Sequence, residues 1–270
     1  MRKAKFLAMM LLAALLYSCG TTSTVPITGR KHRLSVSDEY VLSLSTQQYQ
    51  QYLQQAKKST NAANTAMVQR VGQRLANAVE TYLRGHGFAN EVKNFAWEFN
   101  LVQSNEVNAF CMPGGKIVVY EGILPVTRDE ASLAIVLGHE IAHAVAKHSA
   151  EQMTKSQNSS TLVQLGGGVL SALGVDSNTT QGIATVASQG LSLLNLKYSR
   201  DNESEADYMG LIFAAMAGYD PNVAVTFWQR MAQQSQGQQV VWLSSHPSDA
   251  KRISDIQKHL PEALTYYKKR

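Results

Sequence analysis

The stretch LGHEIAHAVAKHS, residues 137–149, contains the residue types of a metal-dependent hydrolase. His139 and His143 lie four positions apart, which places both imidazoles on the same face of a helix, one turn apart. Two such imidazoles can bind one metal ion, and Glu140 would lie beside that ion rather than on it. A carboxylate in that place can take a proton from a water that zinc polarises as the water attacks a carbonyl. The pattern therefore predicts metal-assisted hydrolysis.

The helix that carries this motif is apolar on nearly all sides, because a run of Leu, Ala, Ile and Val over residues 133–137 leads into it. A helix of that kind is buried. Two histidines and a glutamate inside it would be costly without partners. One metal ion accounts for all three, whereas the alternative, histidines satisfied within the core, needs three separate partners. Thr127 followed by Glu130 fits a capping box and predicts where the helix begins.

A catalytic zinc site needs a third protein ligand and an open fourth position. Candidates lie about sixty residues further on, in the stretch SRDNESEAD, where Glu203 and Asp207 are four apart and share a helix face. Glu205 lies two residues from Glu203 and points nearly the opposite way. One carboxylate of the Glu203 and Asp207 pair can bind the metal while the other orients a ligand histidine.

The motifs HEIAH and SRDNESEAD resemble the pattern His-Glu-x-x-His, then Glu-x-x-x-Asp, of the membrane-associated gluzincin zinc metallopeptidases, the family of HtpX, the CAAX prenyl protease and BepA. The resemblance covers roughly residues 60–260. It implies a zincin-like α+β fold, one zinc ion (Zn2+) per chain and cleavage of peptide bonds. The roles that it implies are zinc ligands at His139, His143 and Glu203, a general base at Glu140, and a second layer of support at Asp207.

Two further stretches gain a role from the same resemblance. Asn108-Ala109-Phe110 is similar to the edge strand on which related gluzincins bind the substrate backbone, and an edge offers unpaired N–H and C=O groups. The alternative is an ordinary strand and turn. His246, before Pro247, resembles a histidine that gluzincins often place to face the zinc. It would stabilise an oxyanion or occupy the fourth metal position in a resting state; the alternative is a surface residue.

Other polar residues receive no chemical role from the sequence. His148 lies nine residues after His139, about 180° round a regular helix, and so cannot share its metal. His86 and His259 lie in loop and tail contexts and are expected at the surface. Arg252 is expected to position the last helix, without a part in the chemistry.

The N-terminus has the layout of a secretory signal, with three cations before a short apolar stretch. Leu-Tyr-Ser-Cys at its end resembles the lipobox of bacterial lipoproteins. Residues 1–18 are therefore predicted to be a signal peptide and Cys19 the lipidated residue; the alternative is a plain secretory signal with a coincidental cysteine. The polar residues 19–40 are expected to form a tether. Gly20 after the cysteine favours the outer membrane of a host with two membranes.

The composition argues against several partner classes. Removing the three signal cations reduces the formal net charge from +5 to +2, and no basic stripe predicts nucleic-acid binding. No run reaches the roughly 18–20 apolar residues that a spanning helix needs. With Cys19 lipidated, Cys111 has no partner for a disulfide and is expected to be buried and inert.

Residues 41–270 are expected to form one α+β domain, mostly helical with a small mixed sheet. Residues 160–196, rich in small apolar residues, are expected either to form a helical hairpin over the site or to rest on a membrane. The other elements expected from periodicity are helices at 41–57 and 62–83 and strands at 96–104, 116–124 and 240–245.

Together these patterns predict a lipid-anchored zinc metalloendopeptidase of the bacterial cell envelope, facing the periplasm, whose substrates by resemblance are unfolded or damaged envelope proteins. The rival interpretation is an envelope assembly or chaperone-like module with a structural zinc that does not cleave its clients. Glu140 weighs against the rival, because a structural site has no use for a base. The sequence leaves the oligomeric state and the cleavage preference open.

Overall fold

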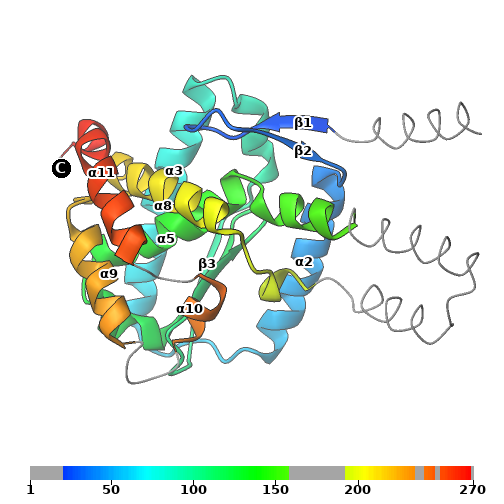
Figure 1. The fold of residues 1–270 in the computed structure, drawn as a ribbon. Coiled ribbons are helices and arrows are strands. Elements are labelled where there is room, and N and C mark those ends of the chain that lie inside the picture. The colour runs from blue at the N-terminus through cyan, green and yellow to red at the C-terminus, as the bar shows by residue number, and fades with distance from the viewer. Residues whose placement is uncertain (1–20, 158–191, 235–239, 247–249, 269–270) are drawn as a thin grey trace, which may run out of the picture.

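The computed structural model describes residues 21–157, 192–234, 240–246 and 250–268 (Figure 1). Its helices are α2 (Asp38–Gln55), α3 (Ala62–Gly85), α4 (Leu124–Thr127), α5 (Glu130–Val145), α8 (Arg200–Met216), α9 (Val223–Gln234), α10 (Val241–Ser245) and α11 (Ala250–Tyr266). Its strands are β1 (Thr21–Thr24), β2 (Lys31–Leu34), β3 (Glu98–Val102), β4 (Ala109–Met112) and β5 (Lys116–Tyr120). A further helix over residues 148–157 follows α5 after a two-residue turn. The predicted class, mostly helical with a small sheet, is confirmed.

The larger sheet has the order β3–β5–β4, so β3 and β4 form its edges. β5 pairs in parallel with β3 and antiparallel with β4, which makes the sheet mixed, as predicted. In the turn between β4 and β5, Gly114 and Gly115 have φ angles of 86° and 79°. These left-handed conformations favour glycine. A Cβ on Gly115 would also lie 2.4 Å from the ring of Trp97.

Alternate residues of β5 enter two different cores. Ile117 and Val119 pack in the cluster that contains the buried residues of α3 and α5. Val118 lies in the other cluster, with Val41 and Tyr49 of α2. This alternation follows from the two-residue period of a strand. The sheet therefore lies between α2 on one face and α3 with α5 on the other, while α8 packs on α5 and α11 packs on α8 (Figure 1).

The start of α5 differs from the sequence prediction. Asp129 caps this helix, since its side chain accepts a hydrogen bond from the Ser132 backbone N–H at 2.7 Å. The predicted cap, Thr127, instead ends the short helix α4, and Arg128 with φ 68° separates the two helices. Thr and Asp are both good N-caps, so the local sequence offered two starts. Helix α8 begins after Ser199 with a capping box.

Two glycines let α5 and α8 approach closely. A Cβ on Gly210 would lie 2.5 Å from the backbone nitrogen of His139, and one on Gly138 would lie 2.6 Å from the carbonyl oxygen of Gly210. Both clashes are with backbone, which cannot move aside as a side chain can. Since Glu203 lies on α8, the glycine contact sets the distance between the two sequence motifs.

Residues 21–34 form a hairpin that packs on the body. β1 pairs antiparallel with β2, and Val25 and Leu34 are buried. Arg30, in the loop between the strands, reaches Glu151 and Glu205. The predicted tether over residues 19–40 is therefore wrong for this segment. The partners of Arg30 lie more than a hundred residues away along the chain, so no local sequence pattern predicts these contacts.

The segment before His246 also differs from its prediction. Residues 241–245 form the helix α10 rather than a strand, a known ambiguity of short apolar runs. The predicted hairpin or membrane patch over residues 160–196 lies almost wholly outside the described residues, and so do the predicted signal peptide and Cys19. Within the described ranges, no helix is long and apolar enough to cross a membrane.

Candidate metal centre

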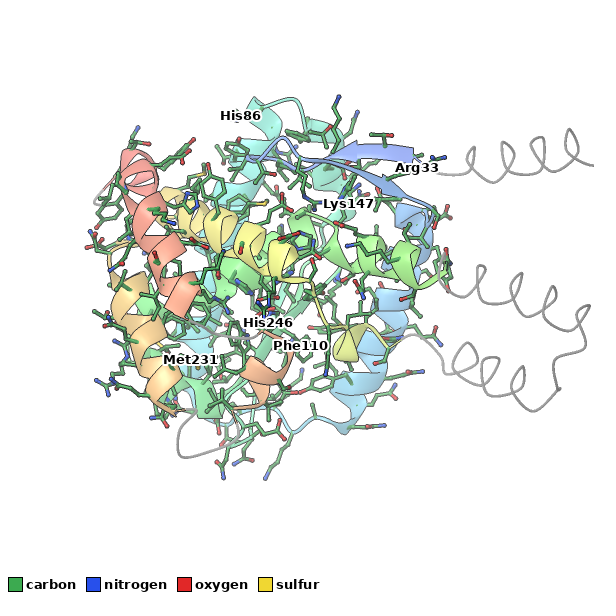
Figure 2. All side chains as sticks on the ribbon, in the orientation of Figure 1. Arg33, His86, Phe110, Lys147, Met231 and His246 are labelled. Carbon is green, nitrogen blue, oxygen red and sulfur yellow. The ribbon has the colours of Figure 1, made fainter. Side chains whose placement is uncertain are left out.

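Four side chains from three helices meet in the interior of the domain. His139 and His143 project from α5, Glu203 from the first turn of α8, and His246 from the end of α10. One ligand atom from each lies within 4.8 Å of the other three, and all four residues are buried. Figure 2 shows His246 at this centre. The sequence predicts the first three as ligands and the fourth as facing the metal.

The donor atoms fit a metal ion. Nε2 of His143 lies 3.0 Å from Nε2 of His139 and 3.3 Å from Oε1 of Glu203. In a tetrahedral zinc site, with zinc–nitrogen distances of 2.0–2.1 Å, donors are separated by roughly 3.3 Å. The second carboxylate oxygen of Glu203 is buried without a hydrogen-bond partner in the described structure. Buried polar atoms are rarely left unpaired, so this oxygen is a further sign that the four donors can hold a cation.

The protonation states suit the same ion. Burial holds the pKa of His139 and of His143 well below the usual value, so both imidazoles are neutral and can offer a lone pair. Burial alone would raise the pKa of Glu203, but its hydrogen bonds with His143 and His246 outweigh this and lower it. Neutral imidazoles with one carboxylate are the donor set of a hydrolytic zinc site.

Asp207 supports His139 from outside the cluster. Its Oδ1 lies 2.8 Å from Nδ1 of His139, and Arg252 donates to the same oxygen at 2.6 Å. If Nδ1 carries the proton, Nε2 is left with its lone pair toward Glu203. Arg252 also lies 3.7 Å above the ring of Trp228. From the sequence, Arg252 was expected only to position the last helix, whereas the structure connects it to the site through Asp207.

Glu140 lies beside the four donors and is held by a tryptophan. The indole N–H of Trp242 donates to Oε1 of Glu140 at 2.7 Å. Burial raises the pKa of Glu140 above its ordinary value, although the charge of His246 and the indole hydrogen bond oppose the rise. A base with a raised pKa is better matched to neutral pH. Trp242 is a functional residue that sequence reasoning missed.

His246 is in contact with both carboxylates of the centre. Its Nδ1 lies 2.9 Å from Oε1 of Glu203, and its Nε2 lies 3.7 Å from Oε1 of Glu140. The ring stacks on Trp242 with centroids 4.5 Å apart. Burial lowers the pKa of His246, but Glu140 and Glu203 outweigh it and raise the pKa. The residue is 4% exposed, so the alternative of a surface histidine is wrong.

The edge strand β4 carries two of the three predicted substrate-binding residues, Ala109 and Phe110. Ala109 is buried, and Phe110 packs edge-on against Tyr52 at 5.2 Å between centroids. Asn108 precedes β4, and its carbonyl accepts from the Tyr120 backbone N–H at 3.1 Å. The residue before it is tied to α10, since the Trp242 backbone N–H donates to the Val107 carbonyl at 3.2 Å.

Three histidines that received no metal role from the sequence, His86, His148 and His259, lie outside the donor cluster, but one of them contacts it. His86 is exposed and His259 is half-buried. His148 is fully buried, and its Nδ1 lies 2.8 Å from Nδ1 of His143. The turn at Lys147, with φ 55°, breaks the regular helix on which the expectation for His148 was based.

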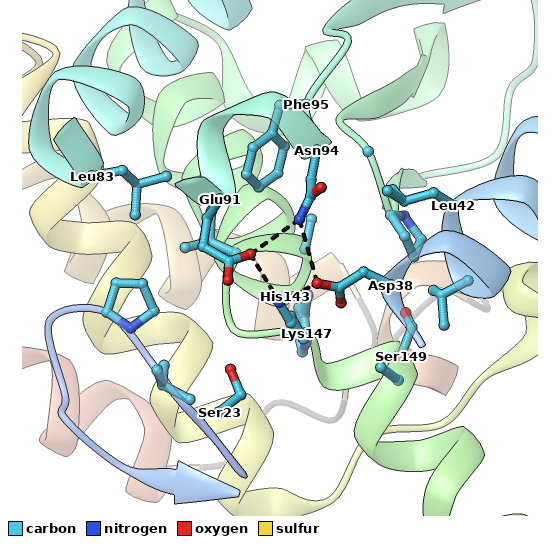
Figure 3. Close-up of a pocket in the computed structure, with 18 of the residues that line it drawn as sticks. Ser23, Asp38, Leu42, Leu83, Glu91, Asn94, Phe95, His143, Lys147 and Ser149 are labelled. Carbon is cyan, nitrogen blue, oxygen red and sulfur yellow. Dashed lines mark hydrogen bonds and ion pairs between the residues drawn. The ribbon is translucent and has the colours of Figure 1, made fainter. Parts of the chain in front are cut away.

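An open pocket lies on the hairpin side of α5 (Figure 3). Lys147 is its central charge and pairs with Asp38 at 2.7 Å and with Glu91 at 2.8 Å. His143 lines one side of the pocket, but Glu140 and His246 do not line it. The pocket therefore lies behind the donor cluster, away from the base.

Comparison with known proteins places the chain in a family. The model of Peptidase family M48 matches residues 44–260. The mitochondrial metalloendopeptidase OMA1 of Schizosaccharomyces pombe is 40% identical over 64% of this chain and 49% of its own length. OMA1 of Saccharomyces cerevisiae is 28% identical over 97% of this chain and 76% of its own length. The beta-barrel assembly-enhancing protease of Yersinia pestis is 31% identical over 63% and 35%.

The matched region contains the whole donor cluster. The chain spans about half the length of the Schizosaccharomyces protein and about a third of the Yersinia protein. The peptidases of the matched family depend on zinc, in agreement with the donor set described above. The resemblance found in the two sequence motifs is thereby confirmed, and the chain belongs to Peptidase family M48.

Proposed function

We propose that this protein is a zinc metalloendopeptidase in which His139, His143 and Glu203 hold one Zn2+ and Glu140 is the general base. The observation that carries the proposal is the place of Glu140: it lies on the same helix as two donors, outside the donor set, and Trp242 fixes one of its oxygens. A purely structural zinc site has no need of such a residue. When bound, zinc polarises the scissile carbonyl and lowers the pKa of a water molecule.

The chain's own residues move the protons. Glu140 accepts the proton of the attacking water and then returns it to the departing amine. Its raised pKa makes both transfers accessible near neutral pH. Asp207 keeps the proton of His139 on Nδ1 and so fixes the orientation of that ring. His246 either donates to the developing oxyanion or occupies the fourth metal position until substrate arrives.

We further propose that the substrate binds as an added strand along β4, beside Asn108, Ala109 and Phe110. β4 is an edge of the sheet, so its outer backbone groups can pair with an extended peptide. Pairing through the backbone does not require any particular side chain in the substrate. It therefore suits a peptidase that acts on unfolded or damaged proteins.

The place of action rests on the N-terminus. We propose that residues 1–18 are removed, that Cys19 is lipidated, and that the metallopeptidase domain, residues 41–270 in the sequence prediction, acts in the bacterial envelope, on the periplasmic side of the outer membrane. The relative from Yersinia pestis is named for enhancing β-barrel assembly, which is consistent with that place. Other relatives are mitochondrial, so the compartment depends on the anchor rather than on the family.

Metal analysis and digestion of an unfolded protein test the activity together. Purified protein should contain about one zinc per chain and cleave casein, and a chelator should abolish cleavage. Glu140→Gln should keep the zinc but lose turnover by roughly 10²–10⁴-fold, the scale of a general base. Glu203→Ala should lose zinc and activity alike. Unchanged digestion by Glu140→Gln contradicts the mechanism, and zinc without any digestion favours the rival, a binding module with a structural metal.

A further inference from the structure

A chain of hydrogen bonds runs from His143 away from the donor cluster. Nδ1 of His143 lies 2.8 Å from Nδ1 of His148, and Nε2 of His148 lies 2.9 Å from Oε2 of Glu205. When Nε2 of His143 binds the metal, the proton of this ring lies on Nδ1. A neutral His148 then accepts on Nδ1 and donates from Nε2 to Glu205. With this arrangement the hydrogen bonds run in one direction, from His143 to Glu205.

Glu205 is in turn held by the N-terminal hairpin. Nε of Arg30 donates to Oε2 of Glu205 at 2.9 Å, and Thr28 Oγ1 donates to Oε1 at 2.6 Å. Three side chains, His148, Arg30 and Thr28, therefore direct hydrogen-bond donors at the carboxylate of Glu205.

We propose that His148, Glu205 and Arg30 are positioning residues for His143, so that the N-terminal hairpin forms part of the support of the metal site. The inference rests on the proposed function, because it takes His143 to be a zinc ligand. It gives the two histidine ligands different supports. His139 meets the carboxylate of Asp207 directly, whereas His143 reaches the carboxylate of Glu205 through a second imidazole.

The break after α5 is what makes this contact possible. Five residues along a regular helix, His148 would lie about 140° round the axis from His143 and would face away from it. The turn at Ala146 and Lys147, with φ 55° at Lys147, redirects the chain. A non-glycine residue in this conformation is uncommon and is retained where the surroundings require it. Here it brings the ring of His148, which is fully buried, onto His143.

Arg30 makes the hairpin more than a surface attachment. Its guanidinium also donates to Oε2 of Glu151 at 2.8 Å, so it bridges two carboxylates from different helices. Arg33 lies on the same hairpin but is exposed, which makes it a matched control (Figure 2). If the hairpin only stabilised the fold, loss of Arg30 would lower the melting temperature without a specific effect on the metal.

Zinc affinity, measured by competition with a chromophoric chelator, tests the proposal without any substrate. Support residues of zinc-binding histidines typically contribute 10–100-fold to metal affinity. We expect His148→Phe to weaken zinc binding by about 10–100-fold and Arg30→Gln by about 10-fold, with Arg33→Gln at the wild-type value. His148→Asn places an amide oxygen near the position of Nδ1 and should recover part of the loss.

Two further measurements keep the outcomes separate. In the zinc-loaded wild-type protein, nitrogen-15 NMR should show a scalar coupling between Nδ1 of His143 and Nδ1 of His148 across their hydrogen bond; its absence overturns the proposal even if the variants fail to fold. Wild-type affinity in His148→Phe and Arg30→Gln also overturns it, while loss of zinc in His139→Ala shows that the proposed zinc site stands. If His139→Ala keeps its zinc, the proposed function is overturned, and so is the support of His143 by His148, Glu205 and Arg30.

Discussion

Oδ1 of Asp207 lies 2.8 Å from Nδ1 of His139, and the two residues come from neighbouring helices packed at a pair of glycines. The same oxygen accepts from Arg252 at 2.6 Å. Burial raises the pKa of Asp207, although the charge and hydrogen bond of Arg252 oppose this. The arginine thus favours the carboxylate form of Asp207, which is the form that accepts a hydrogen bond from Nδ1–H of His139.

Asp207→Asn is expected to weaken zinc binding by roughly 10–100-fold, the range for partners of ligand histidines. The amide keeps the shape of the side chain but cannot match the charge of Arg252. Chelator competition measures the change. Asp201→Asn, an exposed position in the first turn of the same helix, is the control and should bind as wild type. Equal zinc affinity of the two variants would show that Asp207 does not support the metal site.

Trp242→Phe is expected to shift the acidic limb of the pH profile of kcat/KM to higher pH. The indole hydrogen bond lowers the pKa of Glu140, so its removal raises a pKa that burial has already raised. The base must be ionised to act, and activity therefore appears only at higher pH. Trp97→Phe removes a comparable indole–carboxylate bond, to Glu80, and should leave the profile unchanged. An unshifted limb in Trp242→Phe contradicts the link to Glu140.

His246→Ala is expected to retain about one zinc per chain, because three donors remain. Turnover then assigns its role. A fall of about 10²–10³-fold is the scale of a lost oxyanion donor. Retained or increased turnover instead assigns the histidine to the fourth metal position in a resting state. Wild-type zinc affinity together with wild-type kinetics would exclude both roles.

Gly210→Ala is expected to destabilise the domain by about 1–3 kcal/mol, the cost of overpacking. The added methyl would lie 2.5 Å from the backbone of His139, so the zinc affinity should fall as well. Thermal unfolding and chelator competition measure the two effects. Gly85→Ala is the control, since a Cβ there meets nothing within 4 Å. Equal stability of Gly210→Ala and Gly85→Ala would contradict this prediction, because it would mean that α5 and α8 can move apart without a loss in the free energy of unfolding.

Cys19→Ser is expected to release the protein from the membrane fraction or to leave it unprocessed, while its peptidase activity on a soluble substrate survives. Fractionation and mass spectrometry of the mature N-terminus measure this. Wild-type protein that is already fully soluble, with no lipid on Cys19, refutes the anchor.

Helical spacing alone predicted the parts of the site that lie on one helix, whereas the meeting of Glu203 and His246 with the two histidines was expected only from the family resemblance. His139 and His143 share a face because helical spacing dictates it. The same spacing joins Glu203 to Asp207. Arg252 left no such trace, because its contact with Asp207 joins residues 45 positions apart. Tertiary contacts of this kind depend on how helices pack rather than on any local pattern.

The N-terminal hairpin shows the same limit for the fold. Its polar composition indicated a solvated linker, yet Arg30 pairs with carboxylates 121 and 175 residues away. His148 is a related case, because a regular helix was assumed where Lys147 turns the chain. A positive φ at a lysine has no reliable sequence signal.

Trp242 binds the proposed general base through its indole, the residue before Asn108 through its backbone N–H, and the ring of His246 through stacking. The orientation of the base and the position of the segment that leads into β4 therefore depend on one residue. An engineer who alters residue 242 to accept new sequences would also disturb the orientation of the base. Variants with altered selectivity and undiminished turnover should instead be sought on the outer edge of β4, where substitutions leave this tryptophan in place.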